Sequence, residues 1–508
     1  MADGAQDMQD VQDMMRRVRE GRLSRRDFVK RAAAFGFGGS AVAAFLAACG
    51  AAPTATALAP TVSAAGTRAA TTVTGAAPTV AAAATQVAGG TGGAATPRPG
   101  GATTGGSPVA SPRVAGSPAV TGGAGGASGS VKVYSSFPMN SASKAQIDSI
   151  INAIKMAFEE TNYKAGNITI VYDQTTILDD GSPAKNGAWD GAVEAANANK
   201  AAADADAMVY IGTFNSGAAK VAIPILNRVN MVMISPANSY PGLTKKLSAG
   251  IEAGEPDTYY PSGTRSYCRT IATDDRQGAV GATYAQELGA KKVYVIDDTE
   301  LYGHGVAFFF ADTAKKLGMD VTGPEGTDPK ASDYRSLAQK IKTSGADFVY
   351  YGGITDNNPG KIWKDLRAVL GADFKMMGPD GIFEPGWLDQ AGDAAEGSYL
   401  TFGGLPPEQL KGKGADFVKR YTDKYKSAPT SYTAYAYDAA GAVIDALKRA
   451  PRRDRAAIRD ALMATKDYDG ALGKWSFDQN GDSSVTAMSV NQVKNGKFEF
   501  IKVVEPKS

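Results

Sequence analysis

The sequence contains few of the residues on which metal sites and disulfide frameworks depend. Its 508 residues include two cysteines and one histidine, too few for a disulfide framework or for a zinc site built from several such ligands. An excess of either charge is also absent, because 54 lysine and arginine residues are matched by 52 aspartate and glutamate residues. This balance argues against bulk nucleic-acid binding. We therefore expect neither a metal site nor a nucleic-acid partner.

The amino-terminal segment has the pattern of an export signal. Arg25 and Arg26 precede an apolar run rich in alanine and glycine, which is short and weakly apolar for a transmembrane helix. The run ends in Leu-Ala-Ala directly before Cys49. This arrangement resembles a twin-arginine signal that ends in a lipobox. The resemblance implies that residues 1–48 are removed and that Cys49 becomes the lipidated amino terminus; the alternative is a retained amino-terminal membrane anchor.

A linker is expected to follow the lipidated cysteine. Residues 50–129 consist almost wholly of Ala, Thr, Gly, Pro, Ser and Val, with no aromatic residue and with Leu58 as the only leucine. This composition buries too little apolar surface to offset an ordering cost of about 1–2 kcal/mol per residue, so we predict that residues 49–129 are disordered. The acyl chains would then anchor the protein to the outer face of the cytoplasmic membrane, in the periplasm or at the cell surface.

From Ser130 onward, short β-rich runs alternate with stretches long enough for helices. The helix of residues 145–160 has apolar residues mostly at helical spacing. We predict strands at residues 131–134, 168–172, 208–211, 231–234, 293–296, 348–351 and 375–377. This order predicts parallel sheets, with an antiparallel hairpin around Asn495 and Gly496 at the carboxyl end. The segment is too long for one ordinary α/β sheet, so we expect two lobes with a ligand cleft between them.

Five short motifs in this segment occur in a recognisable order. They are Tyr-Ile-Gly-Thr-Phe-Asn-Ser-Gly at 210–217, Met-Ile-Ser-Pro-Ala-Asn-Ser at 233–239, Leu-Tyr-Gly at 301–303, Phe-Val-Tyr-Tyr-Gly-Gly at 348–353 and Met-Gly-Pro-Asp-Gly at 377–381. Their order resembles the leucine/isoleucine/valine-binding family, which comprises substrate-binding proteins of ABC importers with the type I periplasmic-binding fold. The likeness covers essentially residues 131–504.

The resemblance implies a fold class and a division into lobes. It implies a two-lobed α/β (Venus flytrap) fold, in which each lobe is a mainly parallel sheet flanked by helices and the chain crosses between lobes three times. We place these crossings near Thr273, Phe402 and Gly473. The first lobe would then comprise 130–273 and 403–473, and the second lobe 274–402 and 474–508.

The first-lobe residues expected to bind the ligand come from two of the motifs. Ser216 lies where a strand ends and a helix begins, so its hydroxyl and nearby backbone amides can donate hydrogen bonds to an α-carboxylate at the positive end of the helix. By resemblance, Ser216 is the carboxylate-binding serine. Ala237 and Ser239 match the family loop that contacts the head of the ligand, and Ser239 keeps the hydroxyl of the usual threonine.

The second lobe is expected to supply the opposite charge. By resemblance, Asp380 stands where the family commonly has glutamate and would face the α-ammonium group, while Tyr302 would close over the ligand. Ile354 departs from the family, whose best-known members have a tyrosine there, and this departure puts the specificity in doubt. The loop of residues 137–141 is also expected to line the pocket. Tyr432, Tyr435 and Tyr437 are interpreted as core and hinge packing.

The implied function is capture of an amino acid, branched-chain or otherwise apolar, and its delivery to an ABC permease and ATPase complex by a monomeric binding protein. Alternatives within binding are urea, short amides or aromatic acids as ligands, or a ligand-sensing receptor module. An enzyme is disfavoured, because the folded segment has no Gly-x-Ser-x-Gly elbow, phosphate loop or dinucleotide fingerprint; for the same reason we expect no cofactor.

Three further features have simpler interpretations. His304 is expected on a solvated loop at the edge of the cleft. Cys268 is expected to be a buried, unpaired thiol. Residues 478–482 imitate the start of a calcium loop, but the glycine is at the wrong offset, so we interpret this segment as a hairpin turn.

Overall fold

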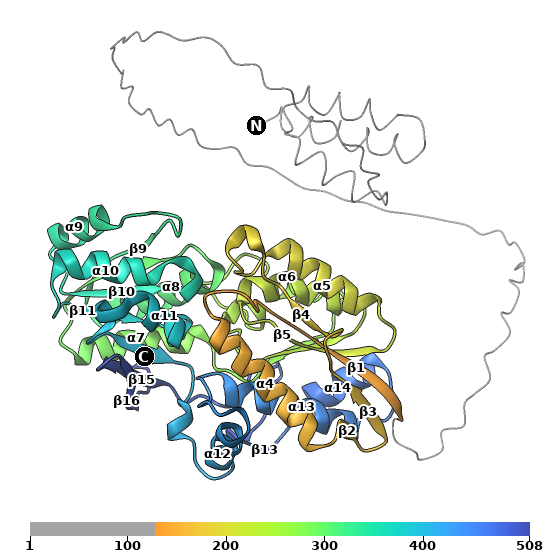
Figure 1. Cartoon of the computed structure of the whole chain (residues 1–508). Helices are drawn as coiled ribbons and strands as arrows, with labels where there is room; N and C mark the ends of the chain where they lie inside the picture. Colours follow the sequence, from red (N-terminus) through yellow and green to blue (C-terminus); the bar gives the residue numbers. More distant parts are fainter. Residues whose placement is uncertain (1–127, 508) are drawn as a thin grey trace, which may run out of the picture. The chain divides into compact units, whose positions relative to one another are not determined.

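The computed structural model describes residues 128–507, which contain two sheets of α/β type (Figure 1). The predicted export signal with Arg25 and Arg26, the lipidation site Cys49 and nearly all of the linker lie outside the described residues. Within residues 128–507, no helix is long and apolar enough to cross a membrane.

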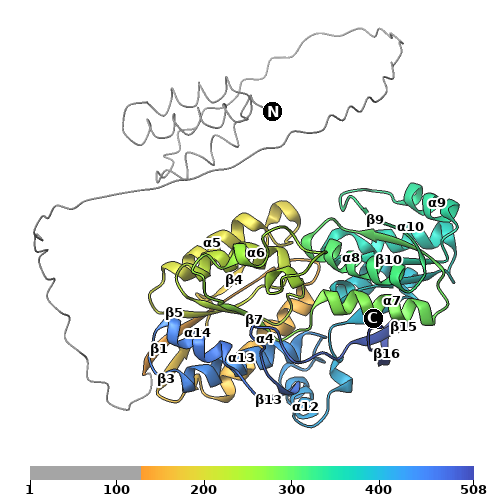
Figure 2. The same cartoon turned by 180° about the vertical axis from the view of Figure 1, so that it is seen from behind.

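The first sheet has the strand order β2-β3-β1-β5-β6-β7, with β4 paired to β1, and only the β2–β3 pair is antiparallel. Its strands are β1 Gly129–Phe137, β2 Lys164–Ala165, β3 Ile168–Val171, β4 Ile177–Asp179, β5 Ala207–Gly212, β6 Val232–Ser235 and β7 Tyr267–Arg269. Its helices are α4 Lys144–Glu160, α5 Gly191–Ala203, α6 Ser216–Asn227, α13 Thr433–Arg449 and α14 Arg455–Met463. Helices α5 and α6 lie on one face, and α4, α13 and α14 lie on the other (Figures 1 and 2). We call this sheet with its helices the first lobe.

The second sheet has the order β16-β15-β12-β11-β10-β8-β9. Its strands are β8 Lys292–Asp297, β9 Asp320–Gly326, β10 Phe348–Gly352, β11 Lys375–Gly378, β12 Tyr399–Phe402, β15 Ser489–Lys494 and β16 Lys497–Val503. Strands β8 to β12 are parallel, whereas β15 and β16 add antiparallel at one edge. Its helices are α7 Asp274–Glu287, α8 Leu301–Lys316, α9 Arg335–Ser344, α10 Pro359–Leu370 and α11 Pro385–Ala391. We call this group the second lobe.

The chain passes between the two lobes three times, as the fold class predicts. It builds the first sheet, enters the second lobe at α7, returns through α12 (Lys413–Tyr425) to α13 and α14, and ends in β15 and β16. A small hairpin of β13 (Tyr468–Gly470) and β14 (Gly473–Trp475) precedes the last crossing. The exact lobe boundaries stay a prediction, because Trp475 and Asp482 still hydrogen-bond to Asp438 and Arg269 of the first lobe.

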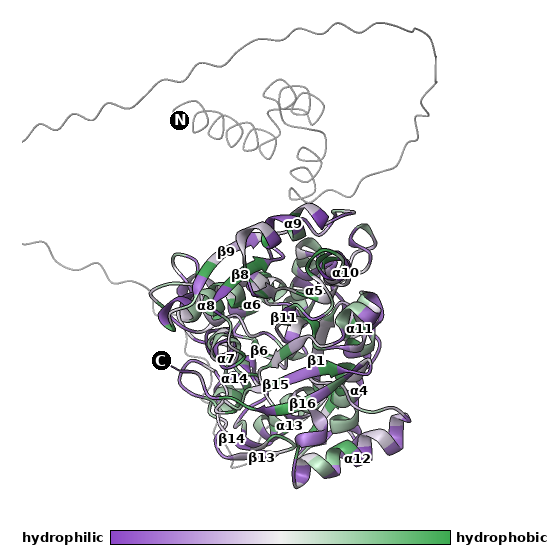
Figure 3. Cartoon of the chain, turned by 90° about the vertical axis from the view of Figure 1, so that its left-hand side faces the viewer, coloured by the Kyte–Doolittle hydropathy of each residue, from purple (hydrophilic) through white to green (hydrophobic). Residues whose placement is uncertain are grey.

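Most predicted elements are present, for reasons that the sequence pattern captures. The apolar runs of β5, β6, β8 and β10 are fully or almost fully buried, as expected for central strands covered on both faces. Hydrophilic residues lie instead on the outer helices α9 and α12 (Figure 3). The predicted hairpin is also confirmed, since Lys494 pairs with Lys497 across Asn495 and Gly496, which both have positive φ. Strand β9 is missed by the pattern because it is an edge strand with little apolar alternation.

One local prediction is wrong. His304 lies in the first turn of α8 and not on a loop. The two glycines beside it made this segment look irregular, but they serve close packing of the helix. A Cβ atom at Gly303 would lie 2.7 Å from the carbonyl oxygen of Gly352, and one at Gly305 would lie 2.9 Å from the ring of Tyr240. Because these two glycines have no side chain, α8 packs closely against Gly352 of its own lobe and Tyr240 of the first lobe.

Candidate functional site

The five residues predicted to bind the ligand line one cavity between the lobes. Its walls are formed by Phe214, Asn215, Ser216, Ala237, Ser239, Tyr302, Ile354, Asp380, Gly381 and Tyr432. All of them except Tyr432, which precedes α13, follow the carboxyl ends of parallel strands in the two sheets, where loops and helix amino termini converge. The cavity has a volume of about 20 Å³, which is close to the space of one water molecule. The lobes are therefore closed on each other, and any larger ligand requires them to separate.

The first wall is the start of α6. Ser216 is the first residue of this helix and is buried, with its Oγ accepting a hydrogen bond from the Tyr240 amide at 3.3 Å. The first amides of any helix lack an acceptor within the helix and carry its positive partial charge. A hydroxyl beside the backbone amides of a helix amino terminus suits a carboxylate. The geometry agrees with the sequence-based role of Ser216, which stays a prediction.

The loop after β6 is held rigidly beside this helix end. Ser235 Oγ accepts hydrogen bonds from the amides of Ala237 and Asn238, at 3.1 and 2.9 Å, and donates to the Thr213 carbonyl at 2.9 Å. The amide of the buried Asn238 side chain donates to the carbonyls of Thr213 and Phe214, at 3.0 and 2.9 Å. The two first-lobe loops that line the cavity are thus tied together, and sequence reasoning missed Asn238 as the connection.

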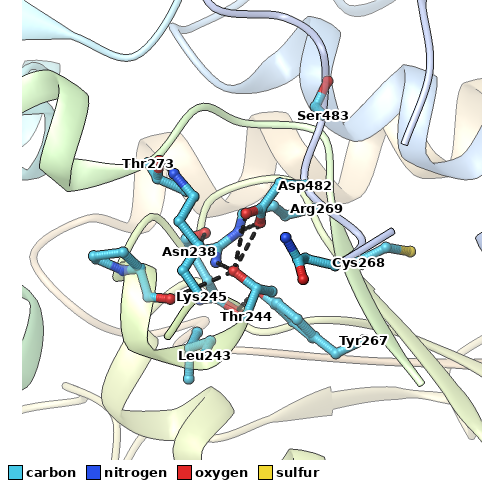
Figure 4. Close-up of polar contacts among 12 residues, drawn as sticks. Asn238, Leu243, Thr244, Lys245, Tyr267, Cys268, Arg269, Thr273, Asp482 and Ser483 are labelled. Carbon is cyan, nitrogen blue, oxygen red and sulfur yellow. Dashed lines mark hydrogen bonds and ion pairs between the residues drawn. The ribbon is translucent and has the colours of Figure 1, made fainter. Parts of the chain in front are cut away.

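Arg269 supports the same loop from behind (Figure 4). Its guanidinium donates to the carbonyls of Asn238 and Tyr240, both at 2.9 Å, to Thr244 Oγ1, and to Asp482 Oδ1 at 2.8 Å. Arg269 is fully buried; burial alone would lower its pKa, but the charge of Asp482 holds that pKa above its ordinary value. In the sequence, the only feature that could have indicated this role is an arginine in a short strand that is otherwise apolar.

The second lobe supplies the acidic wall. Asp380 begins a short 3₁₀ turn, η5 (Asp380–Ile382), and is 2% exposed. Tyr302 donates from its hydroxyl to Asp380 Oδ1 at 2.5 Å, and Tyr432 donates to Asp380 Oδ2. Burial raises the pKa of Asp380, while the hydrogen bonds from these tyrosines and from Gln277 act in the opposite direction. In this closed arrangement, both carboxyl oxygens of Asp380 therefore accept hydrogen bonds from tyrosine hydroxyls.

Tyr432 corrects one prediction. It was assigned to packing, but it lines the cavity and bonds to Asp380. It reaches the site from the residue before α13, and its ring packs edge-to-face on Phe214 and Phe402. Tyr435, by contrast, accepts a hydrogen bond from the Leu405 amide near the second crossing, which agrees with a packing role. Tyr432 and Tyr435 are three positions apart, so the sequence alone could not show which of them lines the cavity and which one packs in the core.

The loop of residues 137–141 does not line the cavity, contrary to expectation. The residues directly after it contact the second lobe instead. The Ala142 amide donates to Asp356 Oδ1 at 2.7 Å, and Ser143 Oγ donates to Glu384 Oε1 at 2.6 Å. Burial raises the pKa of Asp356 to about 6 and that of Glu384 to about 7. These contacts at the start of α4 hold the lobes together at one side of the cleft.

The remaining sequence features lie outside the cavity. Residues 478–482 form a turn, as predicted, in which the Asp478 amide donates to the Asp482 carbonyl at 2.9 Å. Cys268 is buried and, within residues 128–507, has no disulfide partner, which agrees with the prediction. The His304 side chain is 62% exposed and lies 2.9 Å from Asp297. Within the part of the chain that the structure describes, no group of three His, Cys, Asp or Glu side chains could hold a metal ion.

Two lobes of mainly parallel sheet, three crossings and a polar cavity at the facing strand ends define the architecture of a type I periplasmic-binding protein. The chain belongs to the periplasmic binding protein family, whose model matches residues 130–497. This membership confirms the fold class that the five motifs predict.

Known relatives agree with this assignment. A Leu/Ile/Val-binding protein homolog of Brucella suis is 29% identical over 350 residues, which are 68% of this chain and 86% of that protein. A leucine-, isoleucine-, valine-, threonine- and alanine-binding protein of Pseudomonas aeruginosa is 26% identical over 64% of this chain and 80% of its own length. The crystal structure of a leucine-binding protein from Thermotoga maritima matches 74% of this chain and 99% of its own, with a TM-score of 0.64 and 26% identity.

Proposed function

We propose that this chain is an extracytoplasmic solute-binding protein that captures an apolar amino acid, branched-chain ones first, and delivers it to an ABC import permease. One observation carries the proposal. Ser216 with the amino terminus of α6 and Asp380 line the same buried cavity from opposite lobes, so the cavity has one wall for each charge of an amino acid. The names of the relatives support the ligand class.

The charge arrangement explains why capture and closure are coupled. A zwitterion loses the hydration of both charged groups when the cleft closes, at a cost of several kcal/mol unless each group meets a fixed partner. The carboxylate partner belongs to the first lobe and Asp380 to the second. Both contacts are complete only in the closed form, so the ligand favours closure by its differential affinity for that form.

The other walls favour an apolar ligand side chain. Phe214, Ala237 and Ile354 are buried and line the cavity. Ile354 stands where the best-known members of the family have a tyrosine, and it presents an aliphatic side chain to the cavity. We assign Ser216, the amino terminus of α6 and Asp380 to binding of the charged groups of the ligand. The proposed function is therefore binding and transport, without a chemical reaction.

A ligand screen tests this proposal. The purified full chain is heated with leucine, isoleucine, valine, other amino acids, urea, short amides and benzoate. A ligand present at 100 times its dissociation constant stabilises the folded state by about 2.7 kcal/mol, a clear upward shift of the melting temperature. We expect this shift with the branched-chain amino acids. Shifts with urea or benzoate and none with any amino acid would contradict the proposed ligand class.

We also propose that the protein is a monomer, exported and held at the outer face of the cytoplasmic membrane by lipid on Cys49. The support is the sequence pattern around Cys49 together with membership in a family of periplasmic binding proteins. Cells that express the chain should release it from membranes only with detergent. A Cys49→Ser variant should not become lipidated; its remaining as tightly membrane-bound as the unaltered chain would contradict the anchor.

A further inference from the structure

One polar side chain of the ligand cavity has no partner. Asn215 directly precedes α6, lines the cavity and is 7% exposed. Its Oδ1 atom is buried, and within residues 128–507 no hydrogen-bond donor reaches it. In this part of the chain, no other residue that lines the cavity has a buried polar side-chain atom without a partner. Such an atom is costly in a folded protein, so Asn215 needs a physical explanation.

The start of α6 does not explain this side chain. Asparagine is common directly before a helix, because its side chain accepts a hydrogen bond from one of the first helical amides. Asn215 has the extended backbone of that position, with φ −87° and ψ 133°, but its side chain makes no capping bond. Its backbone carbonyl accepts hydrogen bonds from the amides of Ala218 and Ala219, at 3.1 and 3.2 Å. The helix therefore uses the backbone of Asn215 and leaves its carboxamide unused.

A second asparagine beside the cavity shows what a purely structural role looks like here. The Asn238 side chain donates to the carbonyls of Thr213 and Phe214, at 3.0 and 2.9 Å, and accepts a hydrogen bond from the Tyr267 hydroxyl at 3.2 Å. Its donor and its acceptor are both used inside the protein. Asn215 differs, because its oxygen is unpaired and the residue lines the cavity.

The position of Asn215 suits both charged groups of an amino acid. Asn215 directly precedes Ser216, which is assigned to the carboxylate, and it lines the same cavity as Asp380, which is assigned to the ammonium group. That cavity has a volume of only about 20 Å³, so one small group inside it can be reached from all of its walls. A carboxamide carries a donor and an acceptor on one carbon atom. An α-amino acid carries the complementary pair on its Cα, a carboxylate that accepts and an ammonium group that donates.

We propose that the Asn215 carboxamide determines specificity by binding both charged groups of the ligand at once. Its Nδ2 donates to the α-carboxylate, and its Oδ1 accepts from the α-ammonium group. This inference deepens the proposed function and rests on it. An ammonium group has three donors, and both Asp380 oxygens already accept hydrogen bonds from tyrosines, so Asn215 supplies a further acceptor from the first lobe. The ligand class is thereby narrowed to α-amino acids.

The double contact has a consequence for selectivity. A buried polar group that is built to bind a ligand group rejects analogues that leave it unpaired. In β-leucine, 3-amino-4-methylpentanoate, both charges are present but stand one carbon atom further apart, so one carboxamide cannot meet both in the same geometry. We expect the unaltered chain to bind L-leucine more tightly than β-leucine by about tenfold or more, the effect of one lost hydrogen bond to a charged group.

Calorimetry of the full chain with L-leucine tests the double contact. Asn215→Leu has a side chain of similar size without polar atoms and should bind leucine about 10- to 150-fold more weakly. Its preference for leucine over β-leucine should also be smaller. Asn215→Asp keeps an acceptor for the ammonium group but has no donor for the carboxylate, so it should likewise bind leucine more weakly than the unaltered chain.

Thermal unfolding separates this role from a structural one. Asn215→Leu should not lower the melting temperature of the ligand-free chain, because its carboxamide makes no capping bond and its oxygen has no partner to lose. Asn238→Leu is the matched comparison and should lower it, because three hydrogen bonds are lost. A melting temperature lowered as much by Asn215→Leu as by Asn238→Leu would assign Asn215 to the fold and overturn the inference.

The outcomes also separate this inference from the proposed function. Equal leucine affinities of the unaltered chain and Asn215→Leu would overturn the inference and leave the proposed function intact. Tighter leucine binding by Asn215→Asp would overturn the contact with the carboxylate. Equal affinities of the unaltered chain for leucine and β-leucine would overturn the double contact without any variant, even if the variants do not fold. Neither heat nor a thermal shift with leucine, isoleucine or valine would overturn the proposed function, and this inference with it.

Discussion

Replacing Asp380 with asparagine is the most direct perturbation of the site, because it removes the negative charge and keeps the size of the side chain. Asp380 is 2% exposed, so an ammonium group held beside it is almost completely desolvated. Loss of one partner of a buried, hydrogen-bonded charge pair costs about 2–5 kcal/mol of binding free energy. At 1.4 kcal/mol per factor of ten, leucine should bind about 30- to 4000-fold more weakly.

Calorimetry measures the dissociation constant, and thermal unfolding checks that the variant folds. We expect the Asp380→Asn variant to fold, because asparagine keeps the size of the side chain and an oxygen that can accept the hydrogen bond from Tyr302. The matched control is Asp389→Asn on the exposed side of α11 in the same lobe, which should bind leucine normally. A folded Asp380→Asn variant with an unchanged dissociation constant would refute the reasoning and place Asp380 outside the site.

Three further outcomes are expected. Ser216→Ala should weaken leucine binding by about 1.5–3 kcal/mol through loss of a hydrogen bond to the ligand carboxylate; an unchanged dissociation constant by calorimetry would exclude that bond. Arg269→Met should lower the urea-unfolding free energy by about 3–5 kcal/mol, since Asp482 loses its buried partner; an unaltered urea midpoint would show that this pair contributes little. Burial raises the pKa of Asp298 from 3.8 to about 7, so the stability that its protonated form contributes is complete below pH 4 and is lost as the pH rises through 7. Urea unfolding at pH 4, 6 and 8 should show the stability of the unaltered chain relative to Asp298→Asn falling by about 4 kcal/mol over that range, and a constant difference would contradict the shift.

Much of the site could be predicted because its residues are carried by short motifs at the ends of strands. Ser216 and Asp380 each follow a buried apolar run, and in a parallel sheet the carboxyl ends of such runs meet at one edge. The local pattern therefore indicates both the strand and the place of the polar residue after it. The structure brings all five predicted residues to one cavity, while their roles in binding stay a prediction.

The residues that escaped prediction depend on contacts between distant parts of the chain. Arg269 meets Asp482 across 213 positions, and Tyr432 reaches Asp380 across 52. No periodicity or spacing of either segment indicates such a pairing. The same holds for Asp274, which looks like an ordinary helix start in the sequence but is fully buried in the structure.

The sequence alone determined the order of strands and helices, the mainly parallel character of the sheets and the polar groups at the strand ends, because burial periodicity and turn chemistry are local. Only the tertiary structure decided which of these groups face one another and how small the closed cavity is. Those properties arise where three crossings bring two separately built sheets together, and their energies depend on burial and on distances between groups that are remote along the chain.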